Sequence, residues 1–71
     1  LDENTTGTAN VAMGVNTLGA NTTGNNNTAV GAFALDSNTT GTRNSALGMS
    51  ALTSNIAGND VTALGYNALL L

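Results

Sequence analysis

The chain has 71 residues, contains neither Cys nor His, and carries a net charge of −3 with a single basic residue, Arg43. This composition excludes a disulfide framework, removes the commonest metal ligand and general base, and provides no basic surface for nucleic acid. Charged residues make up only 7% of the chain and no run of 18 apolar residues occurs. We therefore expect neither ordinary disorder nor insertion into a membrane.

A 17-residue repeat dominates the sequence. Four units fit without a gap, at residues 4–20, 21–37, 38–54 and 55–71, and residues 1–3 form the end of a preceding unit. We call each unit a coil, and we call residues at the same place in successive units a column. Because the chain begins inside a unit, we expect this single repeat array to be a fragment of a longer chain.

Several columns have a constant chemical character, among them an alanine column of Ala12, Ala29, Ala46 and Ala63. Two contain only glycine, and two are aliphatic. Because each glycine column recurs beside short apolar segments, we expect it to mark a structural turn with positive φ or a close approach of two backbones. We expect the aliphatic columns to form the structural core. The glycines are Gly7, Gly24, Gly41 and Gly58, then Gly14, Gly31, Gly48 and Gly65; the aliphatic residues are Met13, Val30, Leu47 and Leu64, then Leu18, Leu35, Leu52 and Leu69.

Within a coil, the elements follow the same order each time. In the second coil, a strand is predicted around residues 27–31, with Thr28 and Val30 on one face and Ala29 on the other. A bend at Gly31 precedes a second short strand at residues 33–35, and the Asn-Thr-Thr-Gly run supplies an exposed turn. Two glycines in every coil argue against a helical repeat. The predicted fold class is all-β, a repetitive β-roll or β-solenoid of 17-residue coils.

Stacked coils would place each residue about 4.8 Å from its column neighbour, so that Asn and Thr form hydrogen-bonded ladders. A column of like charges would be destabilising, which explains the scarcity of charge. Each coil offers few large apolar side chains, so a single stack buries little. We therefore favour a parallel homotrimer over a monomeric solenoid.

The repeat pattern N-T-T-G-x-x-N-[ST]-A-[VL]-G-x-x-A-L resembles the repeats of phage tail-fibre and tail-fibre-domain proteins. Its kernel, at residues 27–31 and 44–48 and in degenerate form at residues 10–14 and 61–65, is similar to the β-roll head of trimeric autotransporter adhesins. The adhesin heads have a shorter repeat, and the last coil here replaces Asn-Thr-Thr-Gly by residues 55–58, Asn-Ile-Ala-Gly. The resemblance implies a trimeric structural fibre segment, on a virion tail fibre or the cell surface, that supports host attachment through a receptor or surface glycan.

The sequence offers no catalytic, cofactor-binding or metal-binding residues. Asp36 beside Ser37 is interpreted as a solvated turn, and no Asp column exists for calcium, so we predict neither an enzyme nor a cofactor. An alternative function is a monomeric solenoid with an ice- or glycan-binding face of threonine and asparagine. Its two threonine columns are Thr5, Thr22 and Thr39, and Thr6, Thr23 and Thr40. Glycosylation sequons begin at Asn4, Asn21, Asn26 and Asn38, and we attribute them to the asparagine ladders.

Overall fold

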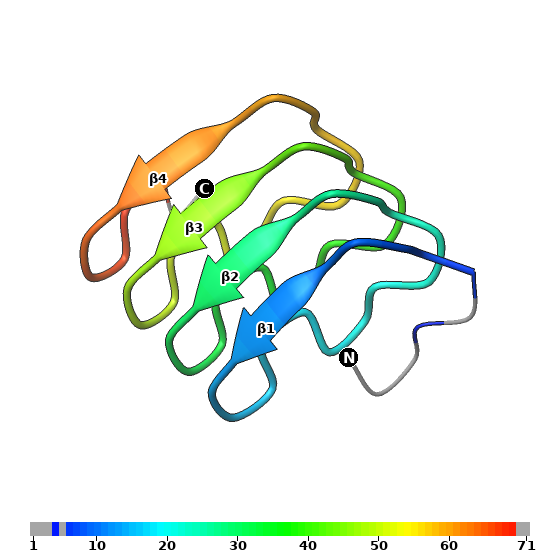
Figure 1. The fold of residues 1–71 in the computed structure, drawn as a ribbon. Coiled ribbons are helices and arrows are strands. Elements are labelled where there is room, and N and C mark those ends of the chain that lie inside the picture. The colour runs from blue at the N-terminus through cyan, green and yellow to red at the C-terminus, as the bar shows by residue number, and fades with distance from the viewer. Residues whose placement is uncertain (1–3, 5, 70–71) are drawn as a thin grey trace.

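The computed structural model describes residues 4 and 6–69, and this part of the chain is all-β with no helix. Its strands are β1 (Val11–Met13), β2 (Thr28–Val30), β3 (Ser45–Leu47) and β4 (Thr62–Leu64). They form one parallel sheet in the order β1-β2-β3-β4 (Figure 1). The all-β prediction is therefore confirmed, and the sheet is compatible with a β-solenoid. The expected end of a preceding coil, residues 1–3, lies outside the described residues.

The register of the sheet aligns the alanine column. Ala12 pairs with Ala29, Ala29 with Ala46, and Ala46 with Ala63. After each strand the chain loops away and returns behind the sheet before it enters the next strand (Figure 1). Parallel neighbours need such a crossover, because a tight hairpin can join only antiparallel strands.

The second strand predicted at residues 33–35 does not form. This segment is a run of turns in which the N–H groups of Ala34, Asp36 and Asn38 each donate to the carbonyl three residues earlier, at 3.2 Å. Phe33 and Leu35 adopt left-handed φ values of 65° and 51°. That conformation costs an L-residue about 1–2 kcal/mol. Hydrogen bonds to the neighbouring coils oppose this cost, with Phe33 donating to Val15 at 2.8 Å and Leu35 to Ala51 at 2.9 Å.

The core lies between the sheet and the returning segment. Three leucines of the predicted core column, Leu18, Leu35 and Leu52, are buried there, whereas Leu69 in the last coil is 47% exposed. The remaining apolar core consists of alanines, namely Ala29, Ala34, Ala46, Ala51 and Ala63. Small side chains allow the two sides of each coil to approach closely, so the coil has little volume to fill.

The other predicted core column is not in the core of the single chain. Met13, Leu47 and Leu64 are exposed, and Val30 is only partly buried. Successive strand residues point to opposite faces, as was predicted for Thr28 and Ala29. Because the alanine column faces inward, the aliphatic column that follows it must face outward. An apolar column therefore lies on the outside of the sheet.

Candidate functional site

The interior of the stack contains a ladder of asparagine side chains. Asn21, Asn38 and Asn55 each donate from Nδ2 to Oδ1 of their counterpart in the preceding coil, at 2.8, 2.9 and 2.8 Å. Asn21 and Asn38 are fully buried. The predicted asparagine ladder is thus confirmed, but it lies inside the stack and not on an exposed turn.

A second interior ladder runs through Asn10, Asn27 and Asn44. Their Nδ2 groups donate to the carbonyls of the next coil's glycines, Gly24, Gly41 and Gly58, at 2.8 Å each. Their Oδ1 atoms accept the backbone N–H groups of Asn27, Asn44 and Val61, at 2.9, 3.0 and 3.0 Å. No buried side-chain nitrogen or oxygen in the described part of the chain lacks a partner. These asparagines therefore hold the register of the coils, because buried amides are costly to leave unpaired.

The two glycine columns require glycine for different reasons. In the second column, Gly14, Gly31, Gly48 and Gly65 have φ values of 127°, 123°, 129° and 122°. In the first, a Cβ on Gly7, Gly24 or Gly41 would collide with the carbonyl oxygen of the next coil's glycine. Gly58 instead lies against the Asn55 side chain of its own coil. The first column permits close stacking, and the second permits the bend after each strand.

The outer face of the sheet carries five aliphatic side chains, three small hydroxyl-bearing side chains and no charge. We define it by the first and third residues of each strand: Val11, Met13, Thr28, Val30, Ser45, Leu47, Thr62 and Leu64. A groove of about 370 Å³ lies over β2, β3 and β4 on this face and is lined by Val30, Leu47 and Leu64 with small side chains between them. No charged side chain lines it.

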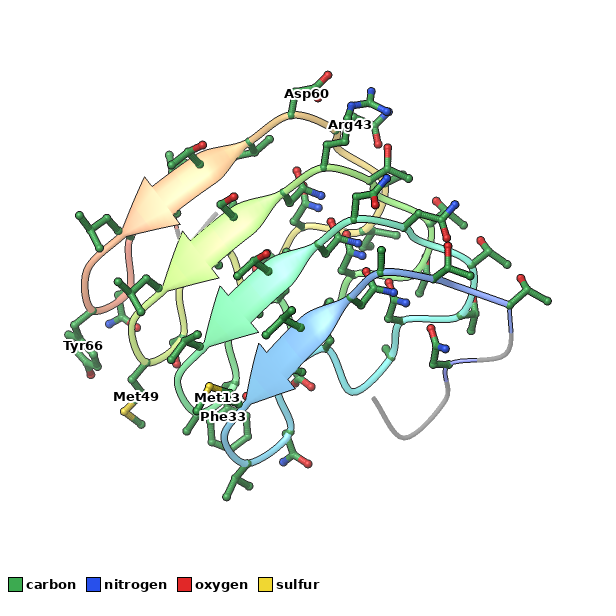
Figure 2. All side chains as sticks on the ribbon, viewed as in Figure 1. Met13, Phe33, Arg43, Met49, Asp60 and Tyr66 are labelled. Atoms are coloured by element: carbon green, nitrogen blue, oxygen red, sulfur yellow. The ribbon has the colours of Figure 1, made fainter. Side chains whose placement is uncertain are left out.

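The apolar surface continues into the loops that follow the strands. Val15, Met49 and Tyr66 share one column and are exposed by 67%, 50% and 71%. Figure 2 shows Met49 and Tyr66 on adjacent loops after β3 and β4, with their side chains directed away from the coils. We call Val15, Met49 and Tyr66 the loop column. The outer face and the loop column together form one exposed apolar surface.

A second groove lies on the returning side of the coils and shares no residue with the first. It has a volume of about 480 Å³ and is lined by Asn16, Gly19, Ala20, Asp36, Ser37, Thr39 and Ile56. Asp36 is half-buried, and within the described residues its carboxylate takes part in no hydrogen bond or ion pair. Ser37 beside it is likewise half-buried, and the groove thus combines a free carboxylate with hydroxyl groups and small apolar side chains.

Arg43 and Asp60 form an ion pair at the opposite end of the strands from Tyr66 (Figure 2). Arg43 Nε lies 2.5 Å from Asp60 Oδ1, and Nη2 lies 3.2 Å from Oδ2. The hydrogen bond from Arg43 lowers the pKa of Asp60, and the same bond raises the pKa of Arg43. Both side chains are more than half exposed, so this pair of opposite charges in one column contributes little to stability.

In the first threonine column, the described hydroxyls bond along the stack to backbone carbonyls of the next coil. The hydroxyls of Thr22 and Thr39 donate to the carbonyls of Thr39 and Ile56, at 3.3 and 3.5 Å. Thr42, which lies outside the two threonine columns, donates from its hydroxyl to Asn59 Oδ1 at 3.1 Å. Thr5 lies outside the described residues. The predicted ice-binding hydroxyls of this face are thus partly engaged within the stack.

The described residues contain no group of acidic side chains that could hold a metal ion, and no helix among them is long and apolar enough to cross a membrane. Of the sequon asparagines, Asn21 and Asn38 are fully buried in the interior ladder, whereas Asn26 is exposed. No family model, no curated protein and no solved structure matches the chain.

Proposed function

We propose that this chain is a non-enzymatic structural segment of a fibre, in which copies of the chain associate in parallel as a homotrimer and support attachment to a host cell or surface. The observation that carries the proposal is the exposed apolar surface formed by the outer face and the loop column. Large apolar patches on a protein surface mark contact sites, because leaving them in water is unfavourable.

The small core supports the same proposal. Among the described residues, the buried apolar side chains are three leucines and five alanines. A domain of this size buries a small fraction of its surface and is often stabilised by association. Contact between outer faces would bury Leu47, Leu64 and Met13 together and would add the large apolar side chains that the interior lacks.

Charge does not oppose such an association. The outer-face groove has no charged lining, and the one ion pair of the described residues lies at the far end of the strands from Met49 and Tyr66. Three chains could therefore approach without burying a charge.

The resemblance of the repeats to tail-fibre proteins and adhesin heads supplies the setting, a virion tail fibre or the cell surface. The proposal includes no cofactor, no nucleic acid and no membrane insertion. Attachment would be to a host receptor or a surface glycan. The competing function remains a monomeric solenoid with an ice- or glycan-binding face.

The test is the solution mass by light scattering, measured with far-ultraviolet circular dichroism. We expect three times the chain mass for the wild-type chain and a monomer for Leu64→Asp. The matched control is Ile56→Asp, because Ile56 is an exposed apolar residue, 58% accessible, that lies outside the outer face. It should leave the trimer intact. A wild-type chain that stays monomeric at millimolar concentration, with a β-type spectrum, would overturn the trimer.

A further inference from the structure

We infer that the groove on the returning side of the coils binds a neutral saccharide chain, with the Asp36 carboxylate as its principal hydrogen-bond acceptor. The inference rests on the proposed attachment function and identifies the surface that would make the contact. It concerns the face that remains free if the outer faces of three chains associate, because the two grooves share no residue.

The chemistry of the groove favours a ligand rich in hydroxyl groups. The Asp36 carboxylate accepts hydrogen bonds only and has no partner within the described residues. Two hydroxyls on adjacent sugar carbons can donate to its two oxygens together. Ser37 and Asn16 add groups that both donate and accept, and Ser37 makes no side-chain hydrogen bond within the described part of the chain.

The apolar part of the groove suits the carbon side of a sugar ring. Ala20 and Ile56 line the groove beside the polar groups, and Ile56 is 58% exposed. Apolar contact combined with a few placed polar groups is the usual composition of a small-molecule site.

The shape of the groove suits a chain better than a single small molecule. Its lining residues come from all four coils, from Asn16 and Gly19 in the first to Ile56 in the last. From Asn16 to Ile56 the chain advances 40 residues, a little over two 17-residue steps, which at about 4.8 Å each span about 11 Å and exceed one sugar ring. Gly19 forms a notch beside Asp36, because a Cβ placed there would lie 3.0 Å from Asp36 Oδ1.

Charge excludes anionic partners. The chain has a net charge of −3, and the only cation, Arg43, does not line the groove. A phosphate- or sulfate-bearing ligand would meet the Asp36 carboxylate without a compensating cation, and the same repulsion applies to nucleic acid.

The test uses the full chain labelled with ¹⁵N, and the probes are oligosaccharides of glucose, of mannose and of galactose at millimolar concentration. We expect at least one to shift the amide signals of Gly19, Ala20 and Ser37 while those of β2 and β3 stay unchanged. Asp36→Asn should weaken that binding about tenfold, and Gly19→Ala, whose backbone has no positive φ, should weaken it by narrowing the notch. Asp60→Asn, outside the groove, should leave the binding unchanged.

Shifts confined to the outer face, or no shift with any of the three probes, would overturn the saccharide site. The saccharide site would also be overturned if the same amide signals shifted with Ca²⁺ or spermine and with none of the saccharides, because the groove would then be a cation site. Light scattering on the same samples reports the assembly separately. A trimer that binds no saccharide would refute the saccharide site but not the proposed assembly. A monomer that binds saccharide would refute the trimer but not the saccharide site.

Discussion

The side-chain amide of Asn38 donates a 2.9 Å hydrogen bond to the side-chain oxygen of Asn21, and both residues are fully buried. Asn38 Oδ1 in turn accepts from Asn55 at 2.8 Å, so the buried side chain joins three coils. A globular core would normally place an apolar residue there. In this stack the same position is polar because every amide finds its partner one coil away.

Asn38→Ala should therefore be strongly destabilising. The substitution removes two inter-coil hydrogen bonds, leaves Oδ1 of the fully buried Asn21 without its donor, and leaves Nδ2 of the half-buried Asn55 with only its 3.3 Å bond to the Gly58 carbonyl. We therefore expect a loss of about 3 kcal/mol in the free energy of unfolding. Urea unfolding followed by circular dichroism measures this loss. The control is Asn26→Gly, since Asn26 is exposed and has φ 60°, which glycine adopts easily. Equal stability of the two variants would contradict a structural role for the ladder.

Gly31→Ala should be more harmful than Gly65→Ala. Both glycines have almost the same φ, 123° and 122°, so an added Cβ strains both backbones by about 1–3 kcal/mol. At Gly31 the Cβ would also lie 2.7 Å from the backbone of Gly48, whereas at Gly65 no atom lies within 4 Å. The difference in thermal midpoint between the two variants isolates the cost of close stacking. Identical midpoints would show that backbone conformation alone explains this glycine column.

Leu35→Ala should destabilise each chain by about 2–5 kcal/mol, because it empties a fully buried site. Leu64→Ala serves as its counterpart, since Leu64 is 72% exposed in the single chain. It should leave the unfolding midpoint in urea unchanged at concentrations where the chain is monomeric, and it should weaken association. A large loss of monomer stability for Leu64→Ala would show that the outer face is not a free surface.

The Arg43–Asp60 pair predicts a small dependence of stability on pH. Because its hydrogen bond with Arg43 lowers the pKa of Asp60 in the folded chain, the contribution of the pair is present above the usual pKa of an aspartate. It is lost as the pH falls through the lowered pKa. Arg43→Gln should therefore flatten the decline of the thermal midpoint below the usual aspartate range, and salt should reduce the difference between the two proteins. A steeper decline in the variant would contradict this sign.

Several features of the fold are predictable because they depend on local geometry. Alternation along a strand correctly separated Ala29 from Thr28 and Val30. Repetition of Gly31 and its counterparts identified a bend. The ladder of Asn21 and Asn38 followed from stacking like residues in register, since an amide can donate to its own copy.

The features that the sequence did not predict depend on which side of each coil faces the interior of the stack. The sequence pattern predicted that Leu47 and Leu64 lie in the core because they are aliphatic. In the structure the inward-facing positions of β3 and β4 are occupied by Ala46 and Ala63, because the coil is too narrow for larger side chains there. The groove beside Asp36 was not predicted, because its lining comes from four coils and involves no recurring motif.

By itself, the amino-acid sequence determined the repeat, the all-β character, the bends and the hydrogen-bonded columns, because each of these follows from residues close in the chain or in identical positions of successive coils. The tertiary structure alone decided that asparagine and alanine face inward while the aliphatic column faces outward, and that residues 33–35 turn where a strand was expected. The physical reason is volume. The space between the sheet and the returning chain is set by how closely whole coils pack, and hydrophobicity of single residues does not specify it.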